Sequence, residues 1–158
     1  MSESNPTGLA AVPDTRSFIR LTLDDRQWLV PRTEAQGLAS LLDLDREVRA
    51  PHSLGALGIA GEWWPVYCLS GELRRLPGLP AARQVCLLLN NGVDQLGLAC
   101  DQVDTVTESI HLHPVPVCMT PPDSPILALA VLERGLGCVT TTEQLARRIA
   151  TFKDDANG

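Results

Sequence analysis

The sequence predicts a mainly β fold built from small barrels, with one short helix near the C-terminal end. Three observations lead to this prediction. Short apolar runs rich in β-branched and aromatic residues recur along the chain, turn signals separate them, and only residues 142–149 have a clear helical pattern. With 158 residues the chain can bury one substantial core, as a single domain or as a compact pair of subdomains.

The first expected element is a hairpin. Residues 17–23 alternate polar and apolar side chains, residues 24–26 interrupt the pattern, and residues 27–31 resume the apolar character. Residues 33–45 have irregularly spaced apolar positions around Gly37, which fits either a short helix or a bent strand. We leave these two alternatives open.

Glycines and asparagines mark the middle strands. Gly55, Gly58 and Gly61 are spaced three apart before the strand-like run 62–69, which indicates a tight bend or a close approach of two backbones. The Asn-Asn-Gly sequence at 90–92 lies between two apolar runs and is a strong hairpin signal.

The C-terminal part is expected to hold a loop, a hairpin and a helix. The stretch 111–125 is interrupted by prolines and is expected to be a loop. A hairpin is expected around residues 133–135. Residues 142–149 then form a helix that begins at a threonine cap and carries arginines near its end, where they suit the helix dipole.

Trp63 and Trp64 are adjacent in a chain with only three tryptophans. On a strand, neighbouring side chains point to opposite faces, so the two indoles cannot fill the same core. One is expected to replace a core aliphatic residue, and the other to point outward as an anchor for a partner. The alternative is that both are buried with their N–H groups bonded.

Composition narrows the possible partners. A net charge of -6 and a pI near 4.9 oppose binding to phosphate backbones, so no nucleic acid is expected. The longest apolar stretches are far shorter than the roughly 20 residues of a membrane span, so no membrane insertion is expected. Five cysteines without a CxxC pair indicate buried free thiols, and with no signal peptide in residues 1–15 we expect a cytoplasmic protein.

Sequence patterns for catalysis or metal binding are weak. His111, His113 and Cys118 are close in sequence but lack a fourth ligand and the paired spacing of a zinc site, so no metal and no cofactor are expected. No catalytic signature is present and the apolar runs are almost purely aliphatic, so no enzyme is expected. Arg16 and Arg20 have the RxxxR spacing of PilZ-type proteins, which bind cyclic dinucleotides.

Four segments together resemble the CheW-like domain over residues 16–150. They are LVP at 29–31, GALGIAGEWWPVYCL at 55–69, LGLACDQVDTV at 96–106 and LALAVLERGLGCVTTTEQLA at 127–146. The positions that match the family patterns are Gly55, Gly61, Pro65, Val66, Leu69, Gly97, Asp101 and Val103.

The resemblance implies two five-stranded SH3-like β-barrels that share a hydrophobic core, with flexible tails at residues 1–15 and 151–158. It also implies a non-catalytic adaptor that couples a chemoreceptor to a CheA-type histidine kinase. The kinase would bind one barrel and the receptor tip would bind a groove between the barrels. The residues expected to contact partners are Leu38, Gly55, Ile59, Gly61, Trp63, Trp64, Asp101 and Val103.

The chain departs from the family at three charged positions, which are Gly37, Ala60 and Cys68 here. We interpret these as linked losses, because removing both members of an ion pair is less costly than removing one. The alternative function is a CheW-like sensor that binds an anionic nucleotide, such as a cyclic dinucleotide, through Arg16 and Arg20.

Overall fold

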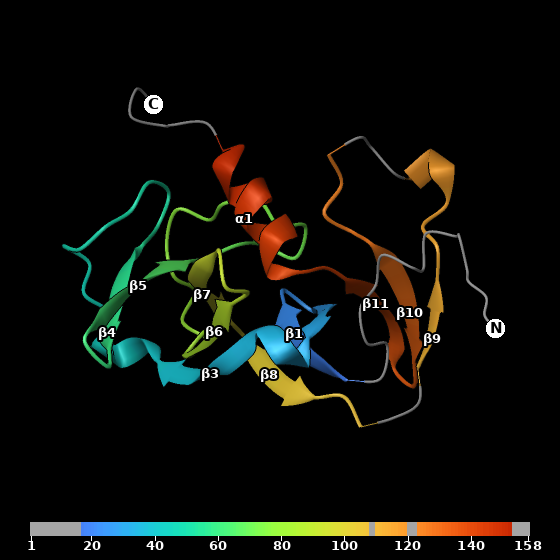
Figure 1. Cartoon of the computed structure of the whole chain (residues 1–158), viewed down its shortest axis with the longest axis horizontal. Coiled ribbons are helices and arrows are strands. Elements are labelled where there is room, and N and C mark those ends of the chain that lie inside the picture. Colours follow the sequence, from blue (N-terminus) through green and yellow to red (C-terminus); the bar gives the residue numbers. More distant parts are fainter. Residues whose placement is uncertain (1–16, 108–109, 120–122, 153–158) are drawn as a thin grey trace.

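The computed structural model describes residues 17–107, 110–119 and 123–152. Within these residues the chain forms two β-sheets and one α-helix, which lies above the junction of the sheets (Figure 1). The predicted tail 1–15 and residues 153–158 of the second tail lie outside the described residues, so the tails stay predictions.

The first sheet has six strands in the order β8-β1-β2-β11-β10-β9. Its neighbours pair antiparallel except β2 and β11, which are parallel. The strands are β1 (Phe18–Leu23), β2 (Arg26–Pro31), β8 (Gln102–Thr105), β9 (His111–His113), β10 (Ala128–Leu132) and β11 (Gly135–Val139).

The second sheet has five strands in the order β3-β6-β7-β5-β4, and β5 runs parallel to β7. Its strands are consecutive in the chain and are inserted between β2 and β8 of the first sheet. They are β3 (Ala35–Ser40), β4 (Gly55–Ile59), β5 (Glu62–Tyr67), β6 (Val85–Asn90) and β7 (Gln95–Cys100).

The single α-helix of the described residues, α1 (Thr142–Ala150), is the helix that the sequence predicts. The Thr141 side chain accepts a hydrogen bond from the Gln144 N–H and so caps the first turn. Leu145 and Ile149 are buried on one side of the helix, so α1 contributes to the core. No helix in the described ranges has the length and apolar character that crossing a membrane requires.

The predicted mainly β fold, with two small β-barrels on a shared core and a short C-terminal helix, is confirmed as a class, and the strands are arranged in two sheets. One sheet has six strands where five were expected, because residues 111–113 form the short edge strand β9 just before Pro114. The open segment 33–45 is the strand β3, which lies between the 3₁₀ turns η2 (Arg32–Glu34) and η3 (Leu41–Asp43).

Two hairpin turns need left-handed backbone. Asp24 and Asp25 connect β1 to β2 with φ of 50° and 70°, and Ala60 and Gly61 connect β4 to β5 with φ of 53° and 82°. Positive φ at both central residues is typical of the tight two-residue turns that match strand twist. The bend that the glycines predicted therefore lies at Gly61.

Gly55 and Gly58 lie within β4 rather than in the bend. A Cβ on Gly55 would sit 2.5 Å from the Asp45 carbonyl oxygen, which belongs to the segment that pairs with this edge of the sheet. The predicted close backbone approach therefore occurs at Gly55.

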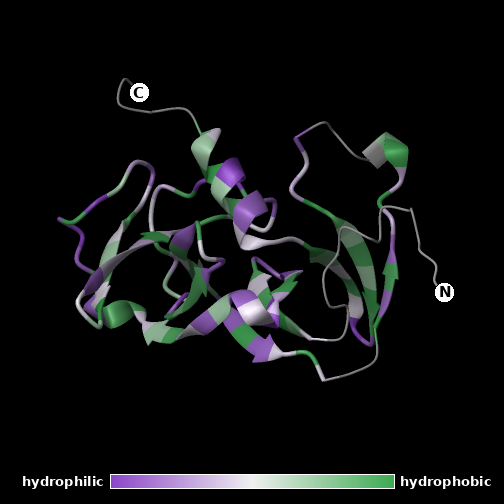
Figure 2. Cartoon of the chain, viewed as in Figure 1, coloured by the Kyte–Doolittle hydropathy of each residue, from purple (hydrophilic) through white to green (hydrophobic). Residues whose placement is uncertain are grey.

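The largest core cluster fills the space between the two sheets and α1. The first sheet contributes Leu21 and Trp28, the second contributes Leu87 and Leu98, and α1 contributes Leu145. A second cluster lies on the other face of the second sheet and includes Trp64. In Figure 2 the strands carry most of the hydrophobic residues, whereas the loop after η3 is largely hydrophilic.

All five cysteines are free thiols, and Cys68, Cys86 and Cys100 are buried as expected. Burial raises the pKa of the Cys86 thiol to about 12. Cys118 is exposed, because it lies in the 3₁₀ turn η4 (Val117–Met119) rather than in a strand.

One buried cation connects the two sheets. The Arg83 side chain is fully buried and forms ion pairs with Asp24, at 2.9 Å from Nη2, and with Asp101, at 3.4 Å from Nε. Its Nη1 donates hydrogen bonds to the carbonyl oxygens of Leu69 and Ala99. Asp24 lies in the β1–β2 turn of the first sheet, whereas the two carbonyls belong to the second sheet region.

The acidic partners of Arg83 are themselves held in place. The Asp24 N–H donates to Asp101 Oδ2 at 2.7 Å, and the Gly71 N–H donates to Asp24 Oδ2 at 3.2 Å. The Trp28 indole donates to the Gly71 carbonyl at 3.0 Å. These bonds connect β2 to the loop after β5, so the ion pairs and the large core cluster support each other.

Replacing Arg83 with Ala is expected to lower the free energy of unfolding by about 3 kcal/mol. The substitution leaves a cavity and leaves two carboxylates without their positively charged partner. Chemical denaturation measures this change. The matched control is Arg74→Ala, since Arg74 is exposed and makes a 3.7 Å contact with Glu72. Its cost should stay below about 0.5 kcal/mol, and equal costs for the two variants would contradict the role given to Arg83.

Candidate interaction surface

A groove separates the two sheets at the edge strands β3 and β8. We name this the inter-sheet groove; it has a volume of about 360 Å³. Each of these strands pairs with a neighbour on one side only, so the groove runs between two sheet edges. Its lining residues are Ile19, Arg32, Ala35, Gln36, Gly37, Leu38, Leu87, Val103, Asp104 and Thr105.

Two residues expected to contact partners lie in this groove. Leu38 is 57% exposed and stands opposite the core residue Leu87 in the β3–β6 pair, so it continues the apolar core surface outward. Val103, on β8, is half-buried and pairs with Leu21 of β1. The fold therefore brings both residues to one continuous feature, although they are far apart in the chain, and their contact with a partner stays a prediction.

Asp104, which lines the groove, forms an ion pair with Arg20, which does not line it. Arg20 donates from Nε and Nη2 to the two carboxylate oxygens of Asp104, at 2.8 and 3.0 Å. A third bond, 3.3 Å long, joins Arg20 Nη1 to the Gln27 side chain. This two-point pairing occupies the same pair of guanidinium N–H groups that a phosphate would need.

The arrangement of Arg20 bears on the alternative nucleotide site. A nucleotide phosphate would have to displace Asp104 before it could bind the Arg20 fork. Arg16, the second arginine of the pattern, lies outside the described residues. The described part of the chain therefore offers no free arginine pair at this place.

Trp63 and Trp64 point to opposite faces of β5. Trp64 is 7% exposed and belongs to the cluster on the outer face of the second sheet. Trp63 is 53% exposed, and its ring lies across Gly58 on the neighbouring strand, 3.4 Å from where a Cβ would be. The predicted divergence of the two indoles is therefore confirmed, with Trp63 as the outward residue, whereas its role as a partner anchor stays a prediction.

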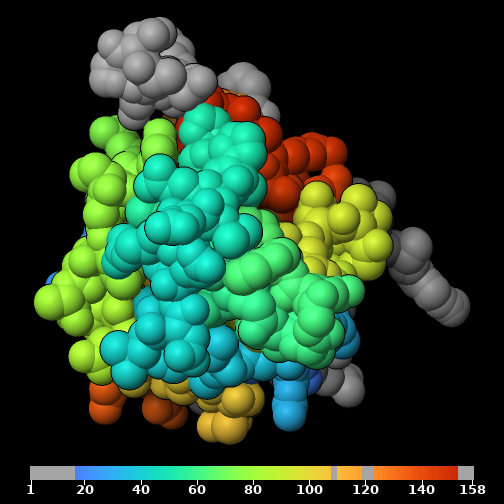
Figure 3. Space-filling view, turned by 90° about the vertical axis from the view of Figure 1, so that its left-hand side faces the viewer, coloured from blue at the N-terminus to red at the C-terminus, as the bar shows by residue number. Residues whose placement is uncertain are grey.

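Trp63 lies on an exposed surface that we name the hairpin face, made of Gly58, Gly61 and Trp63. Ile59 and Glu62 pair with each other at the same end of the hairpin and point to the Trp64 side of the strands. Ile59 is half-buried and Gly61 is exposed in the turn. The β6–β7 turn lies beside this hairpin (Figure 3), and Gln95 at its end contacts the Glu62 carboxylate at 3.5 Å. The hairpin face is thus an exposed indole that packs on Gly58 of the neighbouring strand.

Three of the expected contact residues have structural roles. Gly55 and Trp64 are buried, so neither can touch a partner directly. Asp101 pairs with Arg83 and accepts the bond from Asp24. We therefore leave these three residues out of the proposed contact surface.

The linked loss of charges at Gly37, Ala60 and Cys68 is not supported as a single ion-pair network. Ala60 and Cys68 flank the two ends of the six-residue strand β5, which places them roughly 20 Å apart. Gly37 lies on β3, at the opposite edge of the sheet from β4. These positions are too far apart for charges on them to form direct ion pairs.

Sequence reasoning missed Arg83, which links the β1–β2 turn to the second sheet. Only its position just before a strand could be read from the sequence, and nothing local marks an arginine as buried. His111 and His113 are both exposed on β9. In the described ranges, no group of three or more His, Cys, Asp or Glu side chains could hold a metal ion.

The two tryptophans give a test of this surface. Trp64→Ala should lower the free energy of unfolding by about 3–5 kcal/mol, because it empties part of a packed cluster. Trp63→Ala should cost less than about 1 kcal/mol, because the indole is half-exposed. Thermal and urea unfolding of both variants measure the difference, and similar large losses would show that Trp63 is also a core residue.

Comparisons with known proteins bear on the fold. No protein-family model matches the chain, and no curated protein matches it by sequence. Among solved structures, the chain is similar to the scaffolding protein TtCheW from Thermoanaerobacter tengcongensis, with a TM-score of 0.62 and 14% sequence identity. The match covers 79% of this chain and 88% of that one. The two sheets, their junction and the C-terminal helix thus make up a CheW-like fold.

Proposed function

We propose that this protein is a non-catalytic adaptor of a bacterial chemosensory pathway. It acts in the cytoplasm and couples the cytoplasmic tip of a chemoreceptor to a CheA-type histidine kinase by protein contacts. The likeness to a scaffolding protein supports this function. The observation that carries it is the apolar inter-sheet groove, which lies between two unpaired strand edges.

The inter-sheet groove is the proposed receptor site. Its apolar part, with Ile19, Leu38 and Val103, offers surface that a partner can cover, and Leu38 is already more than half exposed. Arg32, Gln36 and Thr105 form polar edges. An apolar centre with a polar rim is the usual arrangement at protein interfaces.

The hairpin face is the proposed kinase site. Tryptophan is enriched among the residues that contribute most to binding energy, because a large rigid indole buries much surface at a small entropic cost. Trp63 lies on the β4–β5 hairpin at one side of the second sheet, away from β3 and the groove. Two partners can therefore bind the chain at the same time, as coupling requires.

Single substitutions should separate the two contacts. Leu38→Glu places a charge in the groove and should weaken capture of a receptor cytoplasmic fragment by at least about tenfold, with kinase capture unchanged. Trp63→Ala should weaken capture of a CheA-type kinase by a similar factor, with receptor capture unchanged. Surface plasmon resonance with purified partners from the same cells measures both.

Leu136→Glu is the matched control, because Leu136 is 60% exposed on β11, away from both proposed sites. It should leave both affinities unchanged. The adaptor function would be contradicted if the unchanged protein captured neither partner, or if all three variants behaved alike. Calorimetry with a cyclic dinucleotide should give no heat, and saturable binding would favour the sensor instead.

A further inference from the structure

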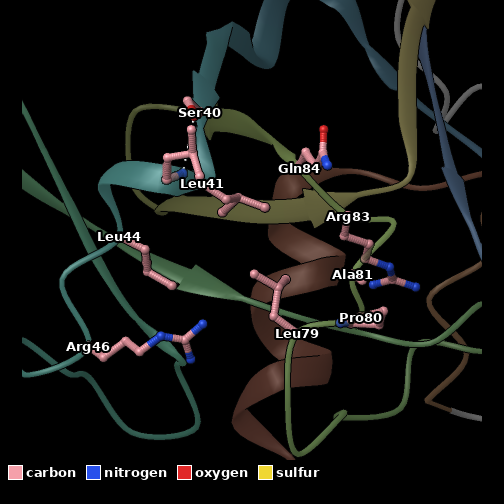
Figure 4. A pocket seen from close by; sticks show the side chains of 10 residues that line it. Ser40, Leu41, Leu44, Arg46, Leu79, Pro80, Ala81, Arg83 and Gln84 are labelled. Atoms are coloured by element: carbon pink, nitrogen blue, oxygen red, sulfur yellow. Dashed lines mark hydrogen bonds between the residues drawn. The ribbon is translucent and has the colours of Figure 1, made fainter.

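A second cavity lies on the other face of the second sheet from the inter-sheet groove. It has a volume of about 530 Å³, within the range of small-molecule sites, and lies between η3 and the loop that leads to β6 (Figure 4). We name it the η3 cavity. Neither proposed partner contact uses it, so a ligand bound there would be independent of the proposed function.

The walls of the η3 cavity are mainly aliphatic. Leu41 is buried in the outer-face cluster, and Leu44 and Leu79 pack against the same cluster. Figure 4 shows the side chains of these three leucines projecting toward a common space, with Pro80 beside Leu79. The hydrocarbon part of a ligand in this space would extend the existing core, and its burial would be favourable.

The cavity also holds one cation. Arg46 comes from the loop after η3, and in Figure 4 its side chain extends below Leu44 toward Leu79. No residue in the described ranges forms a hydrogen bond or an ion pair with its guanidinium. The other lining arginine, Arg83, is neutralised by Asp24 and Asp101. Arg46 is therefore the group in this cavity that can receive an anion.

The surroundings limit the charge of that anion. Asp45 and Glu47 flank Arg46 in the sequence, and Asp43 lies at the end of η3. These carboxylates are close to Arg46 in the sequence and make the region acidic, which disfavours a phosphate dianion, whereas a single carboxylate can still pair with the guanidinium in two-point geometry. The Gln84 side chain also lines the cavity and can donate to a carboxylate.

We infer that the η3 cavity binds an amphiphilic monocarboxylate. The apolar chain of the ligand lies against Leu41, Leu44 and Leu79, and its carboxylate pairs with the guanidinium of Arg46. The two parts of the ligand match the two parts of the cavity, which are the aliphatic wall and the one unneutralised cation.

Titration of the full-length protein with sodium octanoate tests this site, by calorimetry for affinity and by leucine methyl NMR for location. Saturable binding is expected, with shifts at the methyl groups of Leu41, Leu44 and Leu79. Acetate, which has the headgroup alone, should not bind. The neutral analogue 1-octanol should bind roughly tenfold more weakly, because it lacks the charge-assisted pairing.

Three variants make the test specific. Arg46→Gln should weaken octanoate binding by roughly tenfold and leave 1-octanol binding unchanged. Ala81→Phe places a ring in the cavity from an exposed lining position and should abolish the binding of both. Arg49→Gln, an exposed arginine outside the lining, should have no effect.

Several outcomes would overturn the inference. They are the absence of saturable binding, methyl shifts confined to other leucines, and an affinity that Arg46→Gln leaves unchanged. Since Arg46 and Ala81 are both exposed, neither variant should impair folding, and far-UV circular dichroism checks this. None of these outcomes involves a kinase or receptor, so failure here is distinct from failure of the adaptor function.

Discussion

The position of the two sheets relative to each other depends on the contacts made by the fully buried guanidinium of Arg83. A buried cation is costly unless its charge is compensated and its N–H groups find acceptors. Asp24 supplies charge from the first hairpin, Asp101 supplies it from the link between β7 and β8, and backbone carbonyls after β5 and in β7 accept hydrogen bonds from Nη1. Because these groups belong to both sheets, the contacts of Arg83 fix the two sheets relative to each other, and with them the walls of the inter-sheet groove.

The alternation of side chains along the second sheet divides the molecule into two different surfaces. One face shares a core with the first sheet and α1, whereas the other, among the residues that the structure describes, is covered by η3 and by loops. The shared face leaves an apolar groove along its edge strand β3, and the loop-covered face leaves the η3 cavity. Trp63 and Trp64 show the same division on a single strand, because successive residues must contribute to opposite faces.

Local chemistry predicted most of the hairpins and the helix, since turn residues and caps act over a few positions. The Asn-Asn-Gly turn is an example: Asn91 Oδ1 accepts from the N–H groups of Val93 and Asp94. The edge strands β3 and β9 could not be predicted, because short edge strands form only where another strand offers a pairing partner. Alternation predicted that Trp63 and Trp64 diverge, but which one is exposed depends on the register against β4. The burial of Arg83 depends on two aspartates that are distant in sequence, and no pattern in one sequence shows such a meeting.

The three positions where charge was expected from the family resemblance now have separate physical explanations. Gly37 lies in the groove next to a register shift in β3, Ala60 adopts positive φ in a tight turn, and Cys68 lies in an apolar cluster with its thiol 3.4 Å from Arg83 Nη1. Burial raises the pKa of the Cys68 thiol, so this position carries no charge at neutral pH and Arg83 relies on Asp24 and Asp101. The two of these positions that lie at the surface, Gly37 and Ala60, carry no polar side chain. In the proposed adaptor role, partner binding would then come mainly from burial of Leu38 and Trp63. Added salt weakens such apolar burial far less than it weakens surface ion pairs.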